Sequence, residues 1–350
     1  MSTLDFALTC PVPLGRHSTV QLAHGGGGRL TRELIEGLFI PAFDGAILRE
    51  RHDSAVVPLG DTRLAFTTDS YVVHPRFFPG GDIGRLAVYG TVNDLAMAGA
   101  RPLYLSAAFI LEEGLCIDEL RCIAASMRAA AETCGVELVT GDTKVVDRGK
   151  GDGVFVNTSG VGLVHGNVVV HPRRIRPGDA ILLSGDVGRH GVAVLSVRKG
   201  LEFESPIESD CAPLTPLVVA LFNGGVDAHC LRDTTRGGLA TALNELALDA
   251  GVGIEIEERS IPVSEGVCGA CELLGLDPLY VACEGRMVAI VPEPHVDRAL
   301  DALRGCAAGE QAARIGTVQA GPTGMVVLKT GMGSRRLLDL LSGEQLPRIC

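Results

Sequence analysis

The stretch Asp118–Cys134, DELRCIAASMRAAAETC, determines which fold the sequence predicts. Its apolar residues recur at the spacing of one helix face, and Gly135 follows where a C-terminal helix cap belongs. The flanking segments Leu103–Leu111 and Val136–Thr140 are apolar, which predicts strands. A strand, an amphipathic helix and a second strand in succession indicate a mixed α/β architecture.

The same alternation continues along the chain in both directions. Further strands are predicted at Leu64–Val73, Val154–Thr158, Ala180–Ser184, Ile254–Glu257, Met287–Val291 and Met325–Leu328. Further helices are predicted at Thr31–Phe39, Asp82–Ala98, Val192–Val197 and Gly238–Leu248. We therefore expect two domains of α/β type, each an α+β sandwich.

Proline and glycine within Arg173–Asp179 mark the expected domain boundary. We predict a lead-in with a glycine-rich flap over residues 1–40, an N-terminal domain over 41–172, a C-terminal domain over 173–333 and a flexible tail over 334–350. Ser334–Leu341 reads as a short turn or helix, and Gly343–Cys350 as an extended arm. Eight extended residues span up to about 26–29 Å, so the arm can reach a pocket at some distance.

Composition excludes several classes of function. The chain of 350 residues has a net charge of −11, which argues against a nucleic-acid or anionic membrane partner. Its longest apolar runs, such as Leu217–Phe222, are too short to span a bilayer. Met1–Pro13 lacks the basic and apolar segments of a signal peptide, so we expect a cytoplasmic location and reduced cysteines.

Three glycine-bounded or strand-end segments carry carboxylates: Thr68-Asp69-Ser70, Thr91-Val92-Asn93-Asp94 and Gly141-Asp142-Thr143-Lys144. Carboxylate oxygens suit Mg²⁺ together with substrate phosphates, and Lys144 could supply a positive charge for phosphate. Each aspartate taken alone is more often a cap or turn residue. Asp233-Thr234-Thr235-Arg236-Gly237-Gly238 is equally open to two interpretations, a helix cap or an anion site.

The cysteines raise two further hypotheses. Cys268 and Cys271, with Cys283 and Cys306, could bind metal in a non-enzymatic metallochaperone, but a single C-x-x-C favours buried structural cysteines. Cys350, the last residue, could be there by chance, or could carry an acyl-type group on an extended arm. Thiolate is the reactive form, and nearby Arg348 should favour it slightly.

Several motifs together resemble one family, the HypE hydrogenase-maturation proteins, which are carbamoyl dehydratases of the aminoimidazole-ribonucleotide-synthetase-like (PurM-like) superfamily. They occur in family order from about residue 20 to the end. The motifs are His24-Gly25-Gly26-Gly27-Gly28, Gly80-Gly81-Asp82-Ile83-Gly84, Gly90-Thr91-Val92-Asn93-Asp94, Gly141-Asp142-Thr143-Lys144, Thr235-Arg236-Gly237-Gly238, Leu276-Asp277-Pro278-Leu279, Glu284-Gly285 and Pro347-Arg348-Ile349-Cys350. The terminal four residues distinguish this branch from other members. The family usually has proline where Thr234 stands and asparagine where Cys283 stands. The first departure is expected to change the stiffness of a loop, and the second to affect a hydrogen bond that the asparagine amide would make.

The resemblance implies a fold of two PurM-like domains and an activity. A carbamoyltransferase, HypF, would place a carbamoyl group on Cys350. ATP-dependent dehydration of that thiocarboxamide would give a thiocyanate, with a HypC–HypD complex accepting the cyanide for the NiFe-hydrogenase iron. It also implies ATP and Mg²⁺ as cofactors, and a homodimer.

The resemblance also assigns residues to roles. Cys350, Glu284 and Lys144 become candidate catalytic residues, although Glu284 alone would read as a turn carboxylate. The candidate metal ligands are Asp53, Asp69, Asp94 and Asp142. The candidate nucleotide-binding residues are His24, Gly25, Gly27, Asn93, Asp94, Asp142, Lys144, Asp233 and Arg236.

Other superfamily members are the alternative within the enzymes. Selenophosphate synthetase and thiamine-phosphate kinase lack a terminal Pro-Arg-Ile-Cys. The former uses a cysteine or selenocysteine beside a lysine near the N-terminus, whereas here Cys10 precedes proline and Lys144 is the first lysine.

Overall fold

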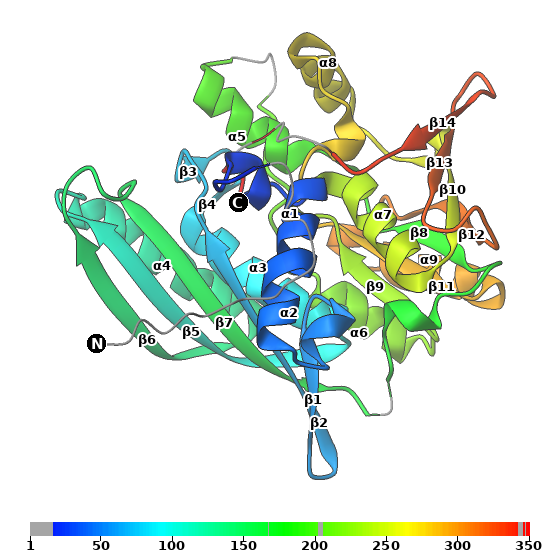
Figure 1. The fold of residues 1–350 in the computed structure, drawn as a ribbon, viewed down its shortest axis with the longest axis horizontal. Helices are drawn as coiled ribbons and strands as arrows, with labels where there is room; N and C mark the ends of the chain where they lie inside the picture. Colours follow the sequence, from blue (N-terminus) through cyan, green and yellow to red (C-terminus); the bar gives the residue numbers. More distant parts are fainter. Residues whose placement is uncertain (1–16, 167, 202–205, 342–345, 347) are drawn as a thin grey trace, which may run out of the picture.

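Two β-sheets, one in each half of the chain, organise the computed structural model (Figure 1). It describes residues 17–166, 168–201, 206–341, 346 and 348–350. Within these residues the first sheet has five strands and the second has seven. Both are mixed with helices, which confirms the predicted α/β fold class.

The first sheet has the strand order β1-β2-β7-β5-β6. Its strands are β1 (Ala55–Leu59), β2 (Thr62–Tyr71), β5 (Ala100–Glu112), β6 (Glu137–Val146) and β7 (Val154–Val164), and a small hairpin pairs β3 (Phe77–Phe78) with β4 (Gly81–Asp82). The helices α3 (Ile83–Met97) and α4 (Ile117–Cys134) cover one face. Asp82 caps α3 by accepting hydrogen bonds from the amides of Gly84 and Arg85.

Helix α3 packs unusually close to β2. A Cβ atom on Gly90 would lie 2.2 Å from the Tyr71 hydroxyl oxygen, so only glycine fits there. The hydroxyl groups of Thr91 on α3 and Thr158 on β7 are hydrogen-bonded to each other. This close approach brings the middle of α3, including Asp94, against the inner face of the sheet.

The second sheet has the order β14-β13-β10-β12-β8-β11-β9. Its strands are β8 (Ala180–Leu183), β9 (Cys230–Asp233), β10 (Gly253–Glu257), β11 (Met287–Val291), β12 (Ala313–Gln319), β13 (Val326–Lys329) and β14 (Arg335–Leu338). Its helices are α5 (Arg189–Lys199), α6 (Thr215–Asn223), α7 (Gly238–Ala250), α8 (Glu265–Leu274) and α9 (Val296–Arg304). None of the helices in the described ranges is long and apolar enough to cross a membrane.

The N-terminal helix lies between the two halves (Figure 1). It runs as α1 (Arg29–Leu34), a π-helical turn (Ile35–Phe39) and α2 (Ile40–Phe43). Arg32 pairs with Asp249 at 3.2 Å, and the Arg29 amide donates to the Leu341 carbonyl at 2.9 Å. These contacts fix the helix to the C-terminal half.

The described end of the tail is docked along the chain just after β2. The amides of Val72 and His74 donate to the carbonyls of Cys350 and Arg348 at 3.0 and 3.2 Å. The Arg348 side chain bonds to the Val72 carbonyl and pairs with Asp152. The tail therefore adds a short strand-like pairing to the first half.

Most predicted elements are present, with three corrections. Ser334–Leu341, expected as a turn or helix, contains strand β14, which pairs antiparallel with β13 and completes the sheet edge. Gly141–Lys144, expected to follow a strand, lies inside β6, which extends to Val146 along its parallel partner β5. Helices α6, α8 and α9 were not predicted, although Ser264 and Gly275, which cap the two ends of α8, were an available signal.

Candidate active site

A polar cavity of about 250 Å³ gathers residues from both halves of the chain. Asp69 comes from β2, Asp94 from α3, Asp233 from the end of β9, and Glu284 from the segment before β11. Cys350, Arg236, Gly27 and Asp53 also line it. These eight predicted site residues, distant in sequence, are therefore brought together.

Neighbouring side chains hold two of the acidic groups, Asp94 and Asp53. The Thr67 hydroxyl donates to the Asp94 carboxylate at 2.8 Å and to the Asp53 carbonyl at 3.0 Å. Arg232 lies 2.6 Å from the Asp53 carboxylate and also pairs with Glu245. Threonine and arginine thus hold the carboxylates at defined positions on the wall of the cavity.

The electrostatics of the cavity favour a cation. Burial raises the pKa of Asp53 to about 6, against an opposing effect of Arg232. Burial and the neighbouring aspartates also raise the pKa values of Asp94 and Asp233. One buried oxygen of Asp53 has no hydrogen-bond partner. Carboxylates forced together in this way fit Mg²⁺, which takes a few carboxylate oxygens and completes its shell with water and phosphate.

Glu284 is the most deeply placed acid. It is 3% exposed, and its Oε1 atom has no hydrogen-bond partner. Burial first, and then the charges of Asp233, Asp69 and Asp210, raise its pKa well above the ordinary value. A carboxyl group with these properties can accept a proton near neutral pH.

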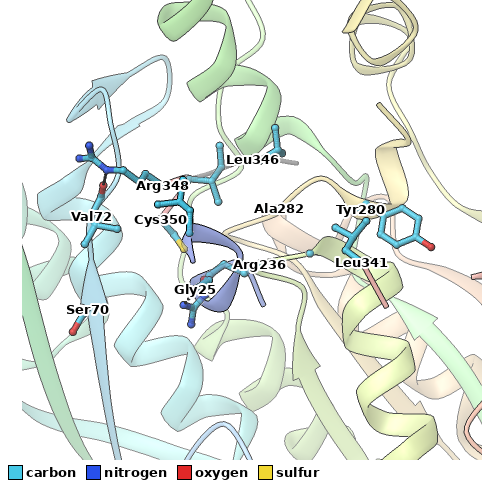
Figure 2. Close-up of a pocket in the computed structure, with 14 residues that line it drawn as sticks. Gly25, Ser70, Val72, Arg236, Tyr280, Ala282, Leu341, Leu346, Arg348 and Cys350 are labelled. Carbon is cyan, nitrogen blue, oxygen red and sulfur yellow. Dashed lines mark hydrogen bonds between the residues drawn. The ribbon is translucent and has the colours of Figure 1, made fainter. Parts of the chain in front are cut away.

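The terminal cysteine lies at the end of the docked tail with its sulfur toward Arg236 (Figure 2), and it also lines the acidic cavity. Burial raises the pKa of the Cys350 thiol strongly, while Arg236 opposes the shift and Glu284 adds to it. The expectation that Arg348 would activate this thiol is wrong, because Arg348 pairs with Asp152 and Arg236 is the nearby cation. At its described end the tail lies in a pocket, as an extended arm could, and Ile349 is buried.

The backbone beside Arg236 depends on glycine. Gly237 and Gly238 both have positive φ angles, 74° and 62°, and lead into α7. A Cβ atom on Gly238 would lie 2.6 Å from the Val281 carbonyl. The two glycines let Arg236 approach the segment that carries Glu284.

A second pocket, of about 570 Å³, adjoins the polar cavity. The two share Asp53, Thr67 and Arg232 among other residues. The second pocket is more apolar, and its wall includes Ile47, Leu48 and Phe66. The two pockets together form one continuous polar-to-apolar site.

Two predicted nucleotide-binding residues serve other purposes in the structure. Asn93 donates to the carbonyls of Ala212 and Glu284 and accepts from the Leu214 amide. Its amide is therefore used to fix the backbone next to Glu284. The ring Nδ1 atom of His24 interacts with the backbone of Gln21, 2.9 Å from its amide nitrogen and 3.2 Å from its carbonyl oxygen. Gly25, in contrast, lines a neighbouring pocket together with Cys350.

Asp142 and Lys144 lie outside the cavity in the single chain. The register of β6 against β5 pairs them with Ala108 and Ile110. Side chains alternate along a strand, so both residues point to the sheet face opposite α3. Their side chains are exposed and form an ion pair at 2.6 Å. The prediction placed them just after the end of a strand at Thr140, and the continuation of β6 to Val146 is the reason for the difference.

The two departures from the family pattern are accommodated locally. The Thr234 amide donates to the Arg286 carbonyl at 3.1 Å, a hydrogen bond that proline could not make. The Cys283 sulfur accepts from the Gly188 amide at 3.2 Å, so the thiol still provides an acceptor.

The cysteines proposed as a metal site are separated in the structure. Cys271, Cys283 and Cys306 belong to three different hydrophobic clusters. Across the described part of the chain, no three His, Cys, Asp or Glu side chains are grouped to hold a metal by themselves. The metallochaperone hypothesis receives no support from this arrangement.

Sequence reasoning missed Arg232 and Glu245 in the cavity wall. The available signal for Arg232 was its position as a charged residue inside the strand Cys230–Asp233, after two apolar residues and directly before Asp233. Nothing in the sequence pattern identified Glu245 on α7.

Comparison with known proteins defines the class and then the family. Residues 51–164 and 176–329 match the N-terminal and C-terminal domains of AIR synthase related proteins. The fold and the acidic site between the halves thus define a PurM-like protein. The carbamoyl dehydratase HypE of Azotobacter vinelandii is 53% identical over 335 residues, which is 96% of this chain and 98% of the relative.

Solved structures of HypE proteins support the same family assignment. The structure of a HypE in complex with ATP has a TM-score of 0.80 and 50% identity, and covers 95% of this chain and 100% of that one. The structure of a HypE–HypF complex has a TM-score of 0.83 and 44% identity, and covers 88% and 99%. This chain belongs to the HypE family of carbamoyl dehydratases.

The raised pKa of Glu284 predicts a pH-dependent effect on stability. The folded state holds the Glu284 proton to higher pH than the unfolded state, so wild-type stability falls as pH rises above the ordinary value of 4.5. Glu284→Gln should therefore match wild type near pH 4.5 and become more stable toward pH 8, by about 1 kcal/mol. Denaturant unfolding at several pH values measures the difference. The exposed control Glu272→Gln should follow wild type, and a constant difference for Glu284→Gln would show that ionisation is not the cause.

Proposed function

We propose that this chain converts a carbamoyl group carried on the sulfur of Cys350 into a thiocyanate, using ATP, for the cyanide ligand of a NiFe-hydrogenase iron. The observation that carries the proposal is the position of the C-terminal residue. Cys350 lines the same cavity as Asp94, Asp233 and Glu284, although it is far from them in sequence. The family membership of the chain supports the same activity.

ATP would bind across the two adjoining pockets. The larger, more apolar pocket suits the nucleoside, and the polar cavity suits the phosphates. Asp53, Asp69, Asp94 and Asp233, which do not form a complete ligand cluster by themselves, would hold Mg²⁺ there together with phosphate oxygens of ATP. When bound, Mg²⁺ neutralises phosphate charge, and Arg236 adds a positive charge beside the sulfur.

The reaction requires the removal of one oxygen and two protons from the S–C(=O)–NH₂ group. The carbonyl oxygen attacks the γ-phosphorus of ATP and ADP leaves, while one N–H proton is lost. The second N–H proton then passes to a base as the C–O bond breaks, which releases phosphate and forms C≡N. Glu284 is suited to accept a proton because its pKa is raised and its Oε1 atom is unpaired.

Loading of the carbamoyl group would take place with the tail displaced. In the docked position, burial raises the pKa of the Cys350 thiol, so it remains protonated and poorly nucleophilic. We propose that HypF loads the cysteine on the extended arm, consistent with the solved HypE–HypF complex. A HypC–HypD complex would accept the cyanide afterwards.

A homodimer would bring Asp142 and Lys144 to the site. Both lie on the open face of the first sheet, whereas the cavity lies on its other side. Tyr104 and Ile110 leave the same open face 49% and 46% exposed. We propose that two copies pair through these faces, so that one copy's Lys144 serves the other copy's Cys350.

The first prediction from this function concerns the metal. Asp94→Asn removes one negative charge from the proposed Mg²⁺ site and should weaken Mg²⁺-dependent ATP binding at least about tenfold. Calorimetric titration with ATP, with and without Mg²⁺, measures the change. Asp118→Asn, whose side chain is 79% exposed on α4, is the matched control. Unchanged affinity in Asp94→Asn would remove Asp94 from the site.

The second prediction concerns proton transfer. Glu284→Gln should still accept the carbamoyl group, but dehydrate it about 10²–10⁴ times more slowly. The intact mass would then stay at that of the carbamoylated protein after ATP is added. Glu272→Gln should dehydrate normally. If Glu284→Gln forms thiocyanate at the wild-type rate, another group is the base.

The third prediction concerns pairing. Ile110→Asp places a charge on the open sheet face and should convert a dimer to a monomer in light scattering after size-exclusion chromatography. Leu273→Asp adds the same charge at an equally apolar, 82% exposed position on α8 and should leave the dimer intact. A dimer that survives Ile110→Asp would place the interface elsewhere.

A further inference from the structure

His190 has no role in the steps above, although it contacts the tail directly. It lies in the first turn of α5 and is fully buried. Its Nε2 atom is 2.8 Å from the Ile349 carbonyl oxygen, and its Nδ1 atom is 2.9 Å from the Ser209 hydroxyl. The Ile349 carbonyl belongs to the peptide bond that joins Ile349 to Cys350.

The direction of these hydrogen bonds follows from their chemistry. Burial lowers the pKa of His190, so the ring is neutral at pH 7 and has one donor and one acceptor nitrogen. A carbonyl oxygen only accepts, so Nε2 carries the hydrogen and donates to Ile349. Nδ1 therefore accepts from the Ser209 hydroxyl, whose oxygen accepts from the Cys211 amide at 3.1 Å.

The same segment contacts Glu284. The Glu284 amide donates to the Asp210 carboxylate at 3.2 Å, and the Ala212 amide donates to the Glu284 carbonyl at 3.4 Å. A Cβ atom on Gly285 would lie 1.9 Å from the Asp210 carbonyl, so the two segments are in direct backbone contact. Residues 209–212 therefore connect the tail contact of His190 with the proposed base.

We propose that His190 is a positioning residue, which holds the Ile349–Cys350 peptide in the cavity and fixes the sulfur relative to Glu284 through Ser209 and Asp210. The docking part stands on geometry alone, and the effect on dehydration rests on the function proposed above. A residue that only filled the core would affect folding and every activity together. A positioning residue affects tail docking and the dehydration step selectively.

Different variants test the contacts of the two ring nitrogens of His190 separately. Asparagine at position 190 can replace the Nδ1 contact with Ser209 but is too short to reach Ile349. Glutamine can extend an amide N–H to the Nε2 position. His190→Asn should therefore release the tail, and His190→Gln should retain part of the docking. Ser209→Ala should weaken docking because it removes the hydrogen bond that orients the His190 ring. His229→Asn, at another buried histidine bonded to Asp179, is the matched control.

Thiol accessibility tests docking without any need for catalysis. Native protein is alkylated with iodoacetamide and cleaved after Glu344, and labelling of the peptide 345–350 is measured by mass spectrometry relative to exposed Cys116. Loss of one hydrogen bond should raise the relative labelling rate of Cys350 about fivefold in His190→Asn, with a smaller rise in His190→Gln and Ser209→Ala. His229→Asn should match wild type. Equal labelling in His190→Asn and wild type would overturn the proposal, as would greater labelling in His190→Gln than in His190→Asn.

Single-turnover measurements test the selective effect. His190→Asn should accept the carbamoyl group at least as fast as wild type, bind ATP normally and dehydrate the group several-fold more slowly. A parallel loss of loading, ATP binding and thermal stability would indicate a core-filling role and overturn the proposal. If wild type itself fails to dehydrate the group, the proposed function fails, and the alkylation result still decides whether His190 docks the tail.

Discussion

Like-charge repulsion among buried carboxylates is the constraint on which the site depends. Asp53, Asp94, Asp233 and Glu284 share a small cavity, and burial and mutual proximity raise the pKa of each. Such an arrangement is unfavourable unless cations balance it. The chain supplies Arg232 and Arg236, and the remaining negative charge is what a magnesium-bound nucleotide site requires.

The fold maintains this arrangement by assembling the cavity from separate rigid elements. Gly90 lets helix α3 lie close to Tyr71 of β2, and a hydrogen bond from Thr67 of β2 holds the Asp94 carboxylate. Asp233 ends a buried strand, and Asn93 connects α3 to the backbone around Glu284 and Leu214. The two halves therefore share one site, and neither half contains it alone.

The described end of the chain is held in a specific position beside the cavity. Backbone pairing with Val72 and His74, the Arg348–Asp152 ion pair and the His190 contact all hold it. In this position burial raises the pKa of the Cys350 thiol. Under the proposed function, the same residue would be loaded by a transferase when the tail is released and would face Glu284 when it is docked.

The sequence predicted the α/β class and most central strands and helices because apolar periodicity is a local signal, whereas the aspartates of the cavity were assigned mainly through the family resemblance. It failed where partners distant in sequence decide the structure. Strand β14 forms because β13 provides its partner, and Asp142 and Lys144 face outward because β5 extends β6. Arg232, His190 and the docking of Cys350 depend on contacts between the two halves, which no local pattern encodes.

The most direct test of Cys350 as the carrier of the carbamoyl group is the mass of the C-terminal peptide. Protein incubated with HypF and carbamoyl phosphate, and then with ATP, is cleaved after Glu344 and compared with Cys350→Ala. We expect the peptide that ends at Cys350 to gain a carbamoyl group first and then to lose one water when ATP acts. Cys350→Ala should show neither change. The same two mass changes in Cys350→Ala, or on another residue of the wild-type chain, would contradict this role of Cys350.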